Sequence, residues 1–133
     1  VNGSMPGYVV ERIAEALNTK RQAINGARIH LFGVAYKKNV SDLRESPALD
    51  IIELLGRRGA ELSYTDPYVP VLEEGHHRLT AVPDDEVGTD IDCAVICTDH
   101  RDFDYPSLPK RFPLVVDTRN ALKGVVADNI FRL

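Results

Sequence analysis

Apolar residues recur along this chain at two alternating spacings, one typical of helices and one typical of buried strands. Residues 5–22 carry Met5, Val9, Ile13 and Leu17 at helical spacing, which predicts a first helix. The pattern from residue 125 onward is ambiguous. The remaining expected elements are strands over residues 27–34, 61–65, 79–82, 93–98 and 114–117, and helices or helical turns over residues 47–58, 69–74, 83–89 and 105–111.

The alternation of strands and helices with short connections predicts an α/β fold. We expect a doubly wound, Rossmann-like parallel sheet with helices on both faces. The helix over 47–58 has clear boundary signals, with Ser46 as its N-cap, Pro47 in its first position and Gly59 just past its end. The first helix lies outside this alternation, so we interpret residues 1–24 as a connector helix and residues 25–133 as the domain itself.

Composition narrows the class of protein. The chain has 133 residues, of which 44% are apolar and 27% charged, a balance typical of a globular domain. Its net charge of −4 argues against a nucleic-acid partner, and no apolar run is long enough for a membrane span. Cys93 and Cys97 lie in one apolar strand, too far apart to bridge, which predicts two buried thiols in a reducing compartment such as the cytoplasm.

The segment after the first strand, residues 33–46, occupies the place where open parallel sheets bind ligands. Gly33 could open a dinucleotide-binding turn, but Ala35 and Lys38 stand where the second and third glycines are required. NAD binding at this turn is therefore disfavoured, and a P-loop fails at Lys38 for the same reason. Lys37, Lys38 and Arg44 could instead pair with phosphate oxygens. A solvated charged loop is the alternative interpretation.

Five segments resemble, in order, one known domain. They read MPGYVV, GVAYKKNVSDLRESPALDII, RRGAELSYTDPYVP, DCAVICTDHRDF and VVDTRN, and together they span most of residues 5–120. This set resembles the C-terminal, UDP-binding domain of the UDP-glucose/GDP-mannose dehydrogenase family. The AYKKN wording is most similar to the branch that oxidises UDP-N-acetylhexosamines.

The resemblance implies an NAD-dependent UDP-sugar 6-dehydrogenase that converts a UDP-N-acetylhexosamine or UDP-glucose to the uronate. In that family NAD and the nucleophilic cysteine belong to other domains, so NAD would not be held by this chain. The cysteine's GGxCxP motif is absent here, and we expect no catalytic residue. The enzyme would be a homodimer or higher homo-oligomer, joined through the central helix whose end is residues 1–24.

The resemblance also assigns site residues. Tyr36, Lys37 and Arg119 would contact the UDP-sugar, although Tyr36 alone could be a core aromatic and Arg119 could simply pair with a nearby carboxylate. We interpret His100 as a structural residue in preference to a proton-accepting base. We interpret His76 and His77 as part of a solvated loop in preference to a metal site. The residues expected to organise the site around its ligand contacts are Asp42, Arg44 and Asp117.

Two other functions are compatible with the residues alone. A stand-alone NAD-binding Rossmann module would explain the strand–turn–helix opening, but it lacks the required glycines. A flavodoxin-like or receiver-like regulatory domain would explain the fold without any small-molecule site. A receiver would need an acidic pocket at the strand ends, whereas the segment after the first strand is mainly basic.

Overall fold

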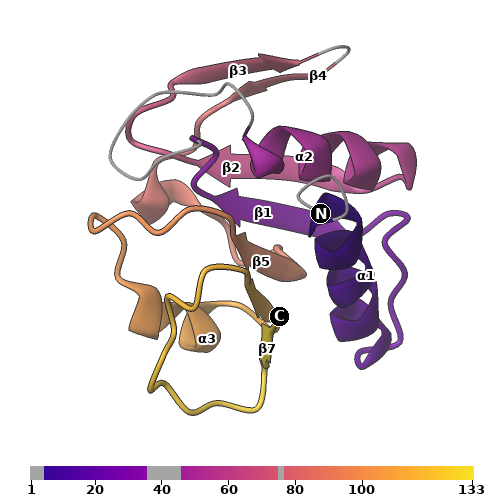
Figure 1. Ribbon diagram of the computed structural model, residues 1–133, viewed down its shortest axis with the longest axis vertical. Coiled ribbons are helices and arrows are strands. Elements are labelled where there is room, and N and C mark those ends of the chain that lie inside the picture. Colours follow the sequence, from indigo (N-terminus) through magenta and orange to yellow (C-terminus); the bar gives the residue numbers. More distant parts are fainter. Residues whose placement is uncertain (1–4, 36–45, 75–76) are drawn as a thin grey trace.

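A computed structural model describes residues 5–35, 46–74 and 77–133 (Figure 1). Its main feature is one parallel sheet with helices packed on it, beside a separate two-stranded ribbon. The elements are α1 (Met5–Asn18), β1 (Arg28–Phe32), α2 (Pro47–Arg57), β2 (Glu61–Thr65), β3 (Val71–Glu74), β4 (His77–Thr80), a 3-10 turn (Asp84–Glu86), β5 (Cys93–Ile96), a 3-10 turn (Tyr105–Ser107), α3 (Leu108–Arg111), β6 (Val115–Asp117) and β7 (Ile130–Arg132).

The sheet has five parallel strands in the order β2-β1-β5-β6-β7, which confirms the predicted fold class. Successive side chains on a strand point to opposite faces, so the central strands β1 and β5 contribute to two cores. Leu31 and Val95 pack with α1 and α2 on one face. Phe32 and Ile96 pack with α3 and its flanking turn on the other. The helices therefore lie on both faces of the sheet (Figure 1).

The ends of α2 follow the sequence signals. The Ser46 hydroxyl accepts a hydrogen bond from the backbone N–H of Ala48 at 3.2 Å, as an N-cap does. Pro47 begins the helix, where the absence of its N–H costs nothing. Gly59 follows the last turn with a φ of +91°, a conformation that side chains disfavour. The predicted α2 is confirmed.

The helix predicted over 69–74 is wrong. Residues Val71–Glu74 form β3, which pairs antiparallel with β4 in a ribbon outside the main sheet. Leu72 is fully buried while Val71 and Glu73 are exposed, an alternation that suits a strand and not a helix. The strand expected over 79–82 exists as β4, two residues earlier, and it belongs to this ribbon.

Near the two ends of the described chain, the elements differ from those that the sequence patterns predict. Helix α1 ends at Asn18 and buries Ile13 and Leu17 completely, packed against α2 and the sheet. The ambiguous tail contributes β7, whose Phe131 lies opposite Val116 of β6. The boundary between residues 1–24 and 25–133 stays a prediction, although α1 shares the core of the domain.

Candidate functional site

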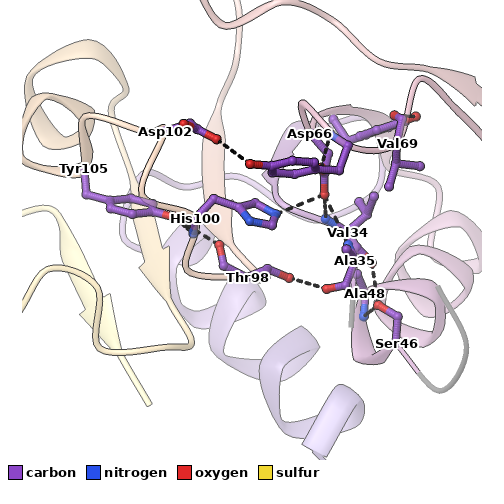
Figure 2. A network of polar contacts seen from close by, with 12 residues as sticks. Val34, Ala35, Ser46, Ala48, Asp66, Val69, Thr98, His100, Asp102 and Tyr105 are labelled. Carbon is purple, nitrogen blue, oxygen red and sulfur yellow. Dashed lines mark hydrogen bonds and ion pairs between the residues drawn. The ribbon is translucent and has the colours of Figure 1, made fainter. Parts of the chain in front are cut away.

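The strand order reverses between β1 and β5, because the chain proceeds from β1 outward to β2 and then returns to the other side of β1. In open α/β sheets the crevice beside such a reversal, at the carboxyl ends of the strands, is where ligands bind. Here it is built by the residues after β1, β2 and β5 (Figure 2). The loop after β6 lies at the same edge. Functional groups of this domain are therefore expected at this edge.

The turn after β1 requires glycine at residue 33. Gly33 has a φ of +85°, and a Cβ built there would lie 2.7 Å from Cβ of Thr98. Because glycine has no side chain, the ends of β1 and β5 can approach each other this closely. The Thr98 hydroxyl then donates to the carbonyl of Ala35 at 2.7 Å.

Asp66 is the centre of a polar network at this edge (Figure 2). It follows β2 and is only 3% exposed. Its Oδ2 accepts hydrogen bonds from the backbone N–H groups of Val34 at 2.8 Å and Ala35 at 3.2 Å, and it lies 3.2 Å from Nε2 of His100. Its Oδ1 accepts from the N–H of Tyr68 at 2.8 Å. One carboxylate thus joins the ends of β1, β2 and β5.

The network favours the charged form of this carboxyl group. Burial raises the pKa of Asp66, but the hydrogen bonds from His100 and from the backbone N–H groups outweigh it and hold that pKa below its usual value. The N–H groups of Val34 and Ala35 therefore donate to a negatively charged carboxylate within the domain. In a dinucleotide-binding turn, the corresponding N–H groups would point at a phosphate. These two N–H groups are therefore not free to bind a phosphate.

His100 is completely buried. Besides its contact with Asp66, its backbone N–H donates to the Tyr105 hydroxyl at 2.6 Å, which donates in turn to the carbonyl of Thr98 at 3.0 Å. Its ring also contacts Phe103, with ring centres 5.6 Å apart. These contacts suit the structural role expected for His100. Sequence reasoning missed Asp66 and Tyr105; the Asp-Pro turn that ends β2 was the available signal for Asp66.

The loop after β6 is organised by Asp117, which is 2% exposed. Its carboxylate accepts backbone N–H bonds from Arg119 at 3.0 Å, Ala121 at 3.1 Å and Leu122 at 2.8 Å. Asn120 adopts a φ of 60°, which Asn tolerates better than most residues. Asp117 therefore shapes the loop that presents Arg119.

Arg119 is exposed and borders a cavity of about 420 Å³ at this edge. Burial raises the pKa of Cys97 to about 12, and the nearby Arg119 guanidinium opposes that rise. The same guanidinium opposes the rise in the pKa of Tyr105. Arg119 therefore lies near enough to affect the ionisation of Cys97, which follows β5, and of Tyr105 in the next 3-10 turn. The cavity is lined by Asp117, Thr118, Arg119, Asn120, Arg132 and Leu133.

The other predicted site residues, Tyr36, Lys37, Asp42 and Arg44, lie outside the described residues, as does His76. The described residues on either side of residues 36–45 are tied together, because the Ser46 hydroxyl donates to the carbonyl of Val34 at 2.6 Å. That segment therefore both leaves and rejoins the described fold at the carboxyl edge, on the side of β1.

Residues 30–124 match the model of the UDP-glucose/GDP-mannose dehydrogenase family, UDP binding domain. This chain belongs to that family. A UDP-N-acetyl-D-mannosamine dehydrogenase of Methanococcus maripaludis is 34% identical to it over 92% of the chain and 29% of the relative. The chain spans about 30% of the length of this relative and of similar UDP-N-acetyl-D-mannosamine dehydrogenases.

Solved structures of the dehydrogenase family share the fold. The structure of a UDP-D-ManNAc dehydrogenase from Pyrococcus horikoshii matches 98% of this chain with a TM-score of 0.79 and 29% identity, using 31% of its own length. A UDP-glucose dehydrogenase from Pyrobaculum islandicum matches 94% of the chain with a TM-score of 0.71 and 27% identity, over 29% of its length. The family resemblance expected from the sequence is confirmed.

Two further findings concern the described part of the chain. The cysteines Cys93 and Cys97 are both free and buried, as predicted. Among the described residues, no three or more His, Cys, Asp or Glu side chains gather as metal ligands would, and no helix has the length and apolar character to cross a membrane.

Proposed function

We propose that this chain is the UDP-sugar-binding domain of an NAD-dependent UDP-sugar 6-dehydrogenase, which oxidises a UDP-N-acetylhexosamine or UDP-glucose to the uronate. The match of residues 30–124 to the family's UDP binding domain carries the proposal. The cavity at the carboxyl edge, with Arg119 beside it, supports it. The UDP-N-acetyl-D-mannosamine dehydrogenases among the relatives favour an N-acetylhexosamine.

In this proposal the diphosphate of the ligand is bound by Lys37 and Arg119, and Tyr36 packs on the nucleotide-sugar. Asp117 supports this role of Arg119, because its three backbone hydrogen bonds hold the loop in one conformation before any ligand arrives. A guanidinium suits phosphate oxygens, since it can donate two parallel hydrogen bonds. Asp42 and Arg44 organise the segment after β1.

The domain would contribute binding energy and orientation to the reaction, not bond making. Binding of the diphosphate fixes the position of the sugar's primary alcohol. The binding energy of the diphosphate is thereby used to align the reacting carbon. The family uses NAD. Because Asp66 already occupies the N–H groups of the β1 turn, we place NAD and the reactive cysteine in the rest of the enzyme.

The proposal extends to assembly and location. Met5 and Tyr8 on α1 are 40% and 49% exposed, and such large apolar side chains suit burial against a second copy. We therefore place a homodimer or higher homo-oligomer contact along α1 in the whole enzyme. Two free thiols suit the reducing cytoplasm.

A ligand titration of the 133-residue chain tests the proposal. Calorimetry and thermal unfolding are measured with UDP, UDP-N-acetylmannosamine, UDP-glucose and NAD. We expect binding of UDP and the UDP-sugars, loss of binding in Lys37→Ala and Arg119→Ala, and none of that loss in Arg57→Ala. Arg57 is the matched control because it is exposed on α2 and pairs with Glu53. Binding of NAD alone would favour the Rossmann module, and binding of none would favour a regulatory domain.

A further inference from the structure

The two residues that precede the segment 36–45 have all their backbone polar groups hydrogen-bonded within the fold. The N–H groups of Val34 and Ala35 donate to Asp66, the carbonyl of Val34 accepts from Ser46, and the carbonyl of Ala35 accepts from Thr98. Of these four bonds, two depend on the single Oδ2 atom of Asp66. Figure 2 shows how these side chains converge on the turn.

Asp66 is suited to set the conformation of this turn. Its Oδ1 is held by the N–H of Tyr68 and its Oδ2 faces His100, so the carboxylate cannot rotate without breaking contacts with residues that follow β2 and β5. Asp66 and His100 are both fully enclosed, with no exposed side-chain surface. A buried charge with several donors is expensive to lose, which makes the arrangement rigid.

We propose that Asp66 is a positioning residue for the UDP-sugar site, which it serves by fixing the backbone of Val34 and Ala35 at the carboxyl edge of the sheet, beside the strand reversal. The inference rests on the proposed function, since it assigns a role at that same site. Asp66 does not touch the ligand. It acts through the turn, and His100 acts through Asp66.

Replacing Asp66 by Asn tests this role because the two side chains have the same shape. An amide has one acceptor oxygen and one NH₂ group, which donates. If its oxygen faces Val34 and Ala35, the NH₂ meets the N–H of Tyr68; in the other orientation the NH₂ meets the two turn N–H groups. Either orientation places donor against donor: the second releases the turn directly, and the first loses the bond from Tyr68 that holds the side chain against the turn.

The matched control is Asp92→Asn. Asp92 also accepts a backbone N–H bond, from Arg28 at 2.8 Å, but it stands at the opposite, amino edge of the sheet. We expect Asp66→Asn to raise the Kd for UDP at least tenfold, by calorimetry, at a temperature where circular dichroism shows the variant folded. We expect less than a twofold change for Asp92→Asn. In the ligand-free variant, exchange of the Val34 and Ala35 amides should accelerate at least tenfold more than that of Leu31.

A pair of variants at His100 covers the case in which Asp66→Asn does not fold. His100→Gln keeps an N–H donor directed at Asp66, whereas His100→Phe keeps only the ring. We expect UDP affinity near the wild-type value in the first and at least fivefold weaker in the second. Equal UDP affinity in wild type and every folded variant would overturn the positioning role alone. Failure of the wild-type chain to bind UDP would instead overturn the proposed function, and with it this inference.

Discussion

His30 offers a quantitative test of how burial controls ionisation in this fold. The residue is 1% exposed on β1, with Nδ1 at 2.6 Å from the Ser63 hydroxyl and Nε2 at 2.7 Å from that of Thr65. The Thr65 hydroxyl donates its proton to the carbonyl of Val82, so it accepts from Nε2. Nδ1 then accepts from Ser63, which assigns a neutral imidazole with both nitrogens satisfied.

Burial lowers the pKa of His30 from 6.5 to about 4; Asp84 opposes this change weakly and Arg111 adds to it. Because folding lowers this pKa, the imidazole of the unfolded chain is protonated between pH 6.5 and about 4, whereas that of the folded chain stays neutral. The stability from the neutral ring is therefore complete above pH 6.5 and is lost as the pH falls toward 4. At about 1.4 kcal/mol per pKa unit, the full loss is roughly 3 kcal/mol, of which about 2 kcal/mol should be lost by pH 5.

The assay is urea unfolding of wild type and His30→Gln at pH 7.5 and pH 5. Carboxyl groups titrate in both proteins, so the difference between their pH dependences isolates His30. We expect the wild-type free energy of unfolding to fall by about 2 kcal/mol more than that of the variant. Parallel losses in the two proteins, or an imidazole resonance of His30 that titrates near pH 6.5, would refute the reasoning.

Three further outcomes follow from burial and backbone geometry. Gly33→Ala should lower the free energy of unfolding by about 1–3 kcal/mol in urea titrations, since its φ is +85° and Thr98 fills the space of the added methyl. Leu72→Ala should cost about 2–4 kcal/mol in the same assay, whereas Val71→Ala on the exposed face of β3 should cost about 0.5 kcal/mol or less. Cys97, 7% exposed and with its pKa raised by burial to about 12, should resist iodoacetamide in the native chain and react on unfolding; equal rates would contradict its burial.

The elements that the sequence predicted correctly are those whose signals are local. Ser46, Pro47 and Gly59 mark the ends of α2 by their own chemistry, and the apolar run from Cys93 identifies a central strand by its continuity. The ribbon of β3 and β4 was mistaken for a helix followed by a sheet strand. Its alternation covers only four residues in each strand, and pairing between the two strands decides their conformation.

The candidate site divides in the same way. The place of Arg119 at the carboxyl edge could be predicted, because it depends only on strand order and on the turn after β6. The role of Asp66 could not, because it depends on the N–H groups of Val34 and Ala35, more than 30 residues away in the chain. No pattern within one segment indicates which backbone groups a distant carboxylate will meet. Tyr36 and Lys37 keep their predicted roles as proposals.

The occupied turn after β1 has a consequence for how affinity can change over evolution. Where main-chain amides hold a phosphate, most substitutions leave the donors in place, so recognition is hard to alter. Here the carboxylate of Asp66 accepts the hydrogen bonds of those main-chain amides. An anion at this edge cannot use those two amides and would depend more on side chains such as Arg119, each of which one codon change can remove or replace. Such a domain can exchange one phosphorylated ligand for another through few mutations while its scaffold stays intact.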